Sequence, residues 1–226
     1  MTETEQHQHK HGHDDHEHEH GNEHDQGLEA MLRYAKNAQR MWTSAVNVAV
    51  VDALELSSAE HLVDIGAGVG AGASVAATQA GQVFAVEPTP YMRRILSARS
   101  RLSRKPFAVV NGSAEATTLP DDSMHAIMAV NTMHHWVDME AACAELARIL
   151  RPGGRMLLVD ENFEDPTHPD HGMWTERHGG ADGHGHHFHM VDTEQIAATF
   201  DVAGLTISSH GDRRVAGRPS WVVEVA

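Results

Sequence analysis

The chain has 226 residues, 41% of them hydrophobic, and a formal net charge of −15 at pH 7. This length can bury a sizeable core in one domain, and the negative charge argues against a nucleic-acid or anionic-membrane surface. The lone Cys143 excludes an internal disulfide, and no run reaches transmembrane length or forms an apolar leader. We therefore expect a cytoplasmic protein with no nucleic-acid or membrane partner; the sequence does not indicate its oligomeric state.

Residues 1–27 contain eight histidines and eight acidic residues, with almost no apolar side chains. Such a segment cannot bury enough surface to offset the entropy of ordering, so we predict a disordered tail. Imidazole and carboxylate are ligands for zinc, nickel or copper(II). Because an unstructured tract fixes no geometry, opportunistic metal binding is favoured over a dedicated metal role. The folded domain is expected to span residues 28–226.

Two apolar stripes at helical spacing, over residues 28–42 and 46–54, predict two helices, the second with Ser44 as its N-cap. From residue 61, short apolar runs alternate with amphipathic ones. The predicted strands are 61–65, 82–86, 106–110, 124–130 and 154–159, and the predicted helices are 73–80, 89–103 and 138–150. This alternation predicts an α/β fold with a doubly wound, Rossmann-like parallel sheet. Cys143 lies on the apolar face of its helix, as a packing residue.

Residues 163–190 break this rhythm with seven histidines and five glycines. The segment is too long for an ordinary connection and is predicted to be a lid or an insertion. A helix over 194–200, capped by Asp192 or Thr193, follows. Two last strands, 205–209 and 221–225, have only the turn-rich stretch 211–219 between them, so we expect them to pair antiparallel.

The stretch VDIGAGVGAGA (63–73) carries the clearest chemical signal. A strand that turns through glycines into a helix presents backbone N–H groups and a positive helix end, which suit a nucleotide-like cofactor. Taken alone, the run also fits the dinucleotide pattern G-x-G-x-x-G/A, so a nicotinamide or flavin stays an alternative to S-adenosylmethionine. Asp64 inside the strand and the paired terminal strands favour S-adenosylmethionine. Glu87, which ends the second strand, suits the ribose of either cofactor.

Four stretches in matching order resemble the class I S-adenosylmethionine-dependent methyltransferases, especially the small-molecule branch of ubiquinone and menaquinone biosynthesis (methyltransferase type 11). They are VDIGAGVGAG (63–72), FAVEPTPYM (84–92), NGSAEATTLPDDSMHAIMAVNTMHHW (111–136) and LARILRPGGRMLLVDE (146–161). The resemblance implies a seven-stranded, mostly parallel sheet with an antiparallel C-terminal strand and helices on both faces. It also implies methyl transfer to a small-molecule acceptor.

Position by position, the resemblance assigns Asp64 to the glycine loop or the methionine ammonium, and Glu87 to the ribose hydroxyls. Ser113 stands where many members carry an aspartate for the adenine amino group, which weakens that assignment. Asn131 would face the methionine part and the acceptor. The full set implied for the cofactor is Asp64, Gly66, Ala67, Gly68, Gly70, Glu87, Pro88, Met92, Ser113, Ala114, Glu115 and Asn131.

Methyl transfer from a sulfonium is an in-line displacement, so the protein mainly aligns the reactants and excludes water. A general base is needed only if the acceptor must lose a proton. Candidates are His134 and His135 after the fourth strand, and Asp160 and Glu161 after the fifth. For His134, a base and a simple pocket wall remain equal alternatives.

The histidine-rich segment supports a second class of function. His184, His186, His187 and His189 are close enough in sequence to share a zinc or nickel ion. The alternative is therefore a metal-binding or metal-responsive protein on a methyltransferase scaffold, and a third option is an NAD-dependent enzyme. A basic cluster over residues 93–105 is interpreted mainly as a solvated helix face.

Overall fold

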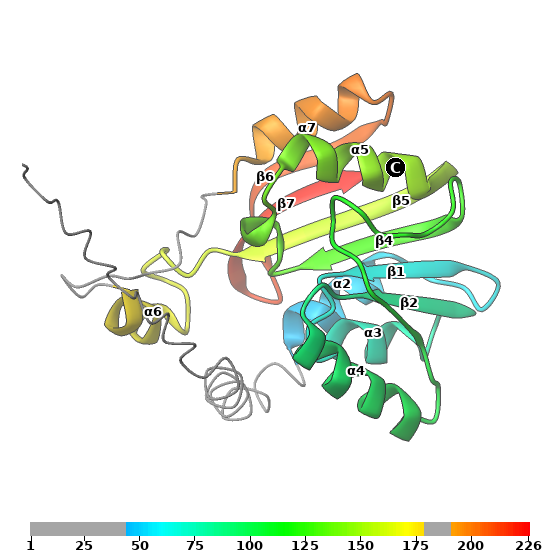
Figure 1. The fold of residues 1–226 in the computed structure, drawn as a ribbon. Helices are drawn as coiled ribbons and strands as arrows, with labels where there is room; N and C mark the ends of the chain where they lie inside the picture. The colour runs from blue at the N-terminus through cyan, green and yellow to red at the C-terminus, as the bar shows by residue number, and fades with distance from the viewer. Residues whose placement is uncertain (1–43, 179–190) are drawn as a thin grey trace, which may run out of the picture.

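The computed structural model describes residues 44–178 and 191–226, which form a seven-stranded sheet covered by helices on both faces (Figure 1). The strand order is β3-β2-β1-β4-β5-β7-β6. The order reverses between β1 and β4, and in open α/β sheets ligands bind at the carboxyl ends of the strands beside such a reversal. The expected Rossmann-like, doubly wound architecture is confirmed.

The first half of the chain forms the parallel strands β1 to β4 and the helices between them. The bounds of these elements are α2 Ala45–Ala53, β1 His61–Ile65, α3 Ala71–Ala76, β2 Gln82–Val86, α4 Pro90–Leu102, β3 Ala108–Val110 and β4 Met124–Val130. Strand β1 pairs with β2 on one side and β4 on the other. Ser44 is the N-cap of α2, as predicted, and accepts a hydrogen bond from the Asn47 amide.

The second half adds the antiparallel edge of the sheet. The elements are η1 Met133–His135, α5 Met139–Ile149, β5 Leu150–Glu161, α6 His171–His178, α7 Thr193–Val202, β6 Ile207–Val215 and β7 Arg218–Val225. Strand β7 runs antiparallel to both β5 and β6, so the expected antiparallel C-terminal strand is confirmed. Asp192 is the cap of α7, since its carboxylate accepts from the amides of Glu194 and Gln195.

Each face of the sheet has its own core. Helices α5 and α7 pack on one face through side chains such as Leu146 and Phe200, and Cys143 is completely buried there as a packing residue. Helices α2, α3 and α4 pack on the other face through side chains such as Val50 and Leu96. Side chains alternate between the two cores along β5, with Leu158 in one and Val159 in the other, so both faces of this strand are covered.

One expectation differs from the structure, and two others fall partly or wholly outside the described residues. Residues 211–219 are not a long turn: β6 and β7 extend toward each other, and the chain reverses at Ala216 and Gly217, both with positive φ. Antiparallel pairing of polar residues overrides their turn composition here. The segment 163–190 contains the helix α6, so it is not loop throughout, and residues 179–190 lie outside the described part of the chain. The predicted helix over 28–42 also lies outside it.

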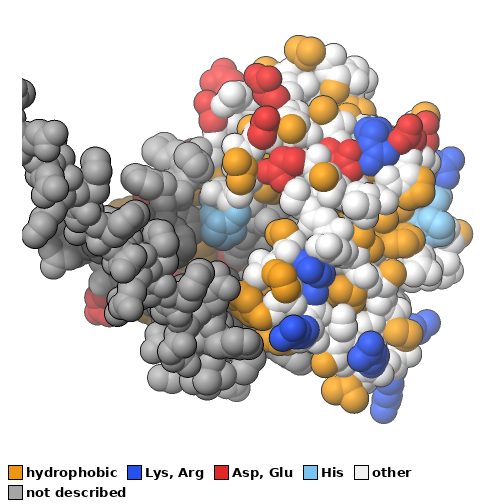
Figure 2. Space-filling model, viewed as in Figure 1, with side chains coloured by type: hydrophobic (Ala, Val, Ile, Leu, Met, Phe, Trp, Pro, Cys, Tyr) orange, Lys and Arg blue, Asp and Glu red, His pale blue; other side chains and the backbone are white. Residues whose placement is uncertain are grey.

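In the view of Figure 2, most acidic side chains lie in the upper part, where α5 and α7 lie, and most Lys and Arg side chains lie below, around α4. Within residues 44–178 and 191–226, no helix has the length and apolar character needed to span a membrane.

The burial of leucine side chains predicts a clear contrast in the stability of two variants. Leu146 of α5 is completely buried, whereas Leu102 at the end of α4 is 87% exposed. We expect Leu146→Ala to lower the free energy of unfolding by about 2–5 kcal/mol, because it leaves a cavity. The same substitution at Leu102 should change it by less than about 0.5 kcal/mol. Urea unfolding of both variants measures the difference, and equal losses would contradict the packing of α5 on the sheet.

Candidate functional site

The glycine loop joins β1 to α3 and leaves an open space at one position. Gly66, Gly68 and Gly70 all have positive φ, which other residues adopt only at a cost. A Cβ on Gly66 would lie 2.1 Å from the Thr132 hydroxyl oxygen, and one on Gly70 would lie 2.5 Å from a methyl carbon of Leu96. At Gly68 the nearest atom is a carbonyl oxygen at 4.0 Å. A ligand can therefore approach the backbone at Gly68, while its neighbours are glycine because of packing.

Asp64 lies beneath the first turn of α3. It is 3% exposed, its carboxylate accepts from the Ala73 amide, and its Oδ2 would be 3.0 Å from a Cβ on Gly72. Burial, with the nearby charge of Glu87, raises the pKa of Asp64 from 3.8 to about 7. This placement fits the expected role of Asp64 in orienting the glycine loop. A cationic ligand beside it would favour the ionised form.

Glu87 directly follows β2 and faces the glycine loop. Its Oε2 accepts from the Gly68 amide at 2.9 Å and its Oε1 accepts from the Thr89 amide at 2.8 Å. The carboxylate is 6% exposed and so is held firmly against the open position of the loop. Each carboxylate oxygen has a second lone pair, which a ribose hydroxyl can use.

Helix α4 contributes one cation to the glycine loop and one to the loop after β2. Arg99 donates from Nη1 to the Val69 carbonyl oxygen at 3.0 Å, and Arg93 donates to the carbonyl oxygens of Glu87 and Pro88. The interpretation of the whole 93–105 cluster as a solvated face is therefore wrong for these two residues. Helical spacing placed them on the inner flank of α4, where they stabilise loop carbonyls.

The turn after β4 lies over the glycine loop and is held by Asp160. The Asp160 carboxylate is 1% exposed and accepts from three successive amides, those of Thr132, Met133 and His134. Its Oδ2 also lies 2.5 Å from His134 Nδ1. A carboxylate is acceptor-only, so His134 Nδ1 carries the hydrogen, and Nε2 is the ring atom directed away from Asp160.

The other candidate bases have different surroundings. The ring of His135, an exposed residue, lies 4.0 Å from that of His134 between centroids. The Asp160 carboxylate already accepts hydrogen bonds from three amides of the turn and from His134. Glu161 accepts from the Asn131 side-chain amide at 2.8 Å, from His168 at 3.0 Å and from Arg218 at 2.8 Å. Neither carboxylate is placed to take a proton from a substrate.

Asn131, at the carboxyl end of β4, has both side-chain polar atoms engaged with Glu161. Its Nδ2 donates to the carboxylate, and its Oδ1 accepts from the Glu161 amide at 2.7 Å. Its φ of +56° is left-handed, which asparagine tolerates better than most residues. The side chain is therefore directed across the sheet toward β5.

The segment Ser113–Glu115 lies beside the same turn. The Ser113 hydroxyl hydrogen-bonds to the Glu115 carboxylate, which accepts from the Val137 amide at 2.8 Å and the Asp138 amide at 3.4 Å. Several hydrogen bonds to the ionised form hold the pKa of Glu115 below its usual value despite the opposing effect of burial. Glu115 thus positions the start of α5, and Ala114 is buried next to it.

Three other residues that the resemblance assigns to the cofactor differ in burial. Met92 of α4 is 4% exposed, whereas Pro88 is an exposed residue of the loop after β2. Ala67 is buried in the core, and its amide donates to the Val86 carbonyl oxygen at 2.9 Å. The assignments of these residues to a cofactor stay predictions.

The metal hypothesis has no counterpart among the described residues. In residues 44–178 and 191–226, no group of three or more His, Cys, Asp or Glu side chains could hold a metal ion. The predicted ligands His184, His186, His187 and His189 lie outside these ranges.

Sequence reasoning missed several residues at the site. Thr132 and Arg99 touch the glycine loop, and His168 and Arg218 reach Glu161. Except for the contact between Glu161 and His168, each of these residues is 30 or more positions from its partner in the chain. The signals in the sequence were the place of Thr132 in the stretch 111–136, two residues after the predicted fourth strand, and the place of Arg99 in the basic cluster.

Comparison with known proteins gives matches over part of the chain. Residues 63–158 match the family described as "Methyltransferase domain". An uncharacterised methyltransferase of Mycobacterium tuberculosis is 36% identical over 109 residues, which are 48% of this chain and 43% of that protein. A demethylmenaquinone methyltransferase of Tropheryma whipplei is 28% identical over 108 residues, 47% of this chain and 44% of that protein.

The fold has matches among solved structures. The crystal structure of a SAM-dependent methyltransferase from Aquifex aeolicus superposes with a TM-score of 0.63 at 15% identity, covering 87% of this chain and 96% of that one. At this identity the likeness concerns the fold alone. The chain spans less than half the length of the curated relatives described above.

The raised pKa of Asp64 predicts a pH dependence of stability. Between its unfolded value of 3.8 and its folded value of about 7, the folded state holds a proton that the unfolded chain has released. The free energy of unfolding should therefore fall as pH rises through this window. Asp64→Asn should reduce that fall and be more stable than the wild type above pH 7, as measured by urea unfolding at several pH values.

Glu60 provides a control of opposite sign. Its hydrogen bond to Arg155 lowers its pKa from 4.5 to about 2. Glu60→Gln should therefore lose stability at neutral pH, and the loss should vanish as pH falls through 4.5 toward 2. An Asp64→Asn variant with the pH dependence of the wild type would contradict the buried, protonated state of Asp64.

Proposed function

Because residues 63–158 match the family described as "Methyltransferase domain", we propose that they form a class I S-adenosylmethionine-dependent methyltransferase domain. We propose that this chain transfers the methyl group of S-adenosylmethionine to a small-molecule acceptor. The observation that carries the proposal is the open approach to the backbone at Gly68, flanked by the buried carboxylates of Asp64 and Glu87. A glycine whose Cβ position is empty beside two buried acids fits a ligand with a sugar diol and an ammonium group.

The residues of this pocket would hold the cofactor in three ways. Glu87 would accept from the ribose hydroxyls while the Gly68 and Thr89 amides keep its carboxylate in place. Asp64 would stabilise the ammonium group, and Met92 would line the adenine. When bound, the cofactor supplies an already activated sulfonium methyl group, so the contribution of the protein is alignment and the exclusion of water.

His134 is the residue we propose as base for an acceptor that must lose a proton. Asp160 orients the ring through Nδ1 at 2.5 Å, which leaves Nε2 as the proton-accepting atom. The three amides bound to the same carboxylate fix the backbone of the turn, and the ring is 13% exposed. Because a buried carboxylate orients the ring, the role of base is favoured over that of a pocket wall.

We further propose that the acceptor is a small molecule and that the protein acts in the cytoplasm, where its thiol stays reduced. Cys143 is buried, and burial raises its pKa to about 12, so it is unsuited to nucleophilic chemistry. The alternative of a metal-responsive protein has no supporting contact among the described residues.

The cofactor assignment predicts a selective effect at Gly68. Gly68→Ala introduces a left-handed alanine, which costs about 1–2 kcal/mol of stability, and its methyl group enters the space that the cofactor would occupy. We expect its Kd for S-adenosylhomocysteine, measured by calorimetry, to rise at least tenfold.

Gly204 supplies a matched control for this variant. It has a φ of +81° and no atom within 4 Å of a Cβ, but it lies after α7, away from the loop. Gly204→Ala should lose similar stability and bind S-adenosylhomocysteine like the wild type. A wild-type protein that does not bind S-adenosylhomocysteine would overturn the proposed function.

The role of His134 predicts a rate effect without a binding effect. In a methylation screen that detects S-adenosylhomocysteine release, His134→Asn should lower kcat about 10²–10⁴-fold, as expected for loss of a general base. His135→Asn should retain most activity. If both variants keep wild-type turnover, or if His134→Asn changes KM alone, His134 is a wall of the pocket.

A further inference from the structure

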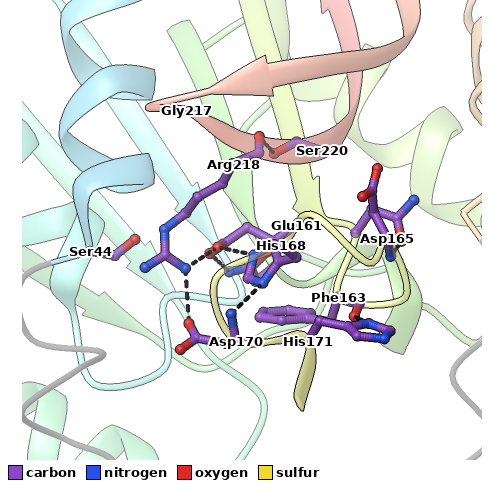
Figure 3. A network of polar contacts seen from close by, with 12 residues as sticks. Ser44, Glu161, Phe163, Asp165, His168, Asp170, His171, Gly217, Arg218 and Ser220 are labelled. Carbon is purple, nitrogen blue, oxygen red and sulfur yellow. Dashed lines mark hydrogen bonds and ion pairs between the residues drawn. The ribbon is translucent and has the colours of Figure 1, made fainter. Parts of the chain in front are cut away.

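Glu161 lies at the point where three separate segments meet at the carboxyl end of the sheet (Figure 3). Its side chain is 5% exposed and ends β5. It contacts Asn131 at the end of β4, His168 in the segment after β5, and Arg218 at the start of β7. Figure 3 shows the side chains of His168 and Arg218 converging on the Glu161 carboxylate.

On one side, Glu161 fixes the turn that covers the glycine loop. Its backbone amide and its Oε1 bind the two ends of the Asn131 side-chain amide, at 2.7 and 2.8 Å. Asn131 has a left-handed backbone, and the next residue, Thr132, packs directly against Gly66. The rotamer of Asn131 is therefore set by Glu161 immediately beside the proposed cofactor pocket.

On the other side, Glu161 holds the segment Asn162–His178. Its Oε2 accepts from His168 Nε2 at 3.0 Å and from Arg218 Nη1 at 2.8 Å. His168 has a completely buried side chain, and its Nδ1 accepts from the Asp170 amide at 3.0 Å, which makes it the neutral tautomer with the hydrogen on Nε2. Arg218 also pairs with the Asp170 carboxylate at 3.0 Å.

The same segment is tied to the β6–β7 hairpin by neighbouring bonds. The Asn162 amide donates to the Pro219 carbonyl oxygen at 2.8 Å, and Arg214 donates to the Thr167 hydroxyl at 2.6 Å. These contacts would hold the segment without a buried charge. The Glu161 side chain is 5% exposed and that of Arg218 is 30% exposed. Burying the charge of Glu161 costs desolvation, so docking of the segment alone does not explain a carboxylate at this position.

We propose that Glu161 is a positioning residue for the methyl-transfer site, coupling the docking of segment 162–178 to the conformation of Asn131. The inference rests on the proposed function, because it assigns the coupled turn to the cofactor pocket. A glutamate suits this position because it accepts at both ends, whereas a glutamine would present one donor to Asn131 or to His168 and Arg218. Docking of the segment and the geometry of the pocket then depend on one carboxylate.

The test uses Arg218→Met, which removes two ion pairs of the junction without touching Asn131. Arg213→Met is the matched control, because Arg213 lies on the same hairpin but pairs with the half-exposed Glu224. We expect Arg218→Met to raise amide hydrogen exchange of residues 162–171 at least tenfold. It should also shift the Asn131 side-chain amide signal in a ¹H–¹⁵N spectrum and raise the Kd for S-adenosylhomocysteine at least threefold.

Arg213→Met should change none of these three quantities. If Arg218→Met loosens the segment but leaves the Asn131 signal and the Kd equal to those of the control, the junction is structural only and the inference is wrong. Glu161→Gln should reproduce the shifted Asn131 signal directly. Failure of the wild type to bind S-adenosylhomocysteine would refute the proposed function separately, since the exchange and spectroscopic measurements need no ligand.

Discussion

The close approach of the turn after β4 to the glycine loop is the constraint on which the site depends. Gly66 has no room for a Cβ because the Thr132 side chain occupies that position. The glycine loop and the turn are therefore in direct contact, and each limits the conformation of the other. Gly68, two residues further on, escapes this constraint and faces open space. The contact with Thr132 thus distinguishes Gly66, which packs against the turn, from Gly68, which a ligand can approach.

Buried carboxylates hold the two sides of this contact. Asp64 supports the loop through the first turn of α3, Glu87 binds the Gly68 amide, and Asp160 binds three amides of the turn after β4. Each acid receives N–H donors in place of the water that it loses on burial, which is the condition for burying a charge at acceptable cost. Asp64 has the fewest such partners, so burial and the nearby charge of Glu87 raise its pKa.

The segment after β5 extends this arrangement away from the glycine loop. Glu161 receives donors from β4, from the segment and from β7, so it joins elements that are remote in sequence. The antiparallel strand β7 is essential to this junction, because it brings Arg218 beside the end of β5. An all-parallel sheet would place the opposite end of that strand there. The terminal strand pair therefore shapes the site as well as completing the sheet.

The sequence by itself determined the fold class, the order of most elements, the glycine turn and the acids Asp64 and Glu87. Local signals carry this information: apolar periodicity, glycines that permit positive φ, and caps such as Ser44 and Asp192. It misjudged the stretch 211–219, where strand pairing outweighed turn composition. Only the tertiary structure decided that Asp160 orients His134 and that Glu161 joins three segments. It also decided that Arg99 binds the glycine loop and that Arg93 binds the loop after β2. These contacts join residues that are far apart in the chain. The periodicity of a local segment gives no information about which distant residues will lie beside it.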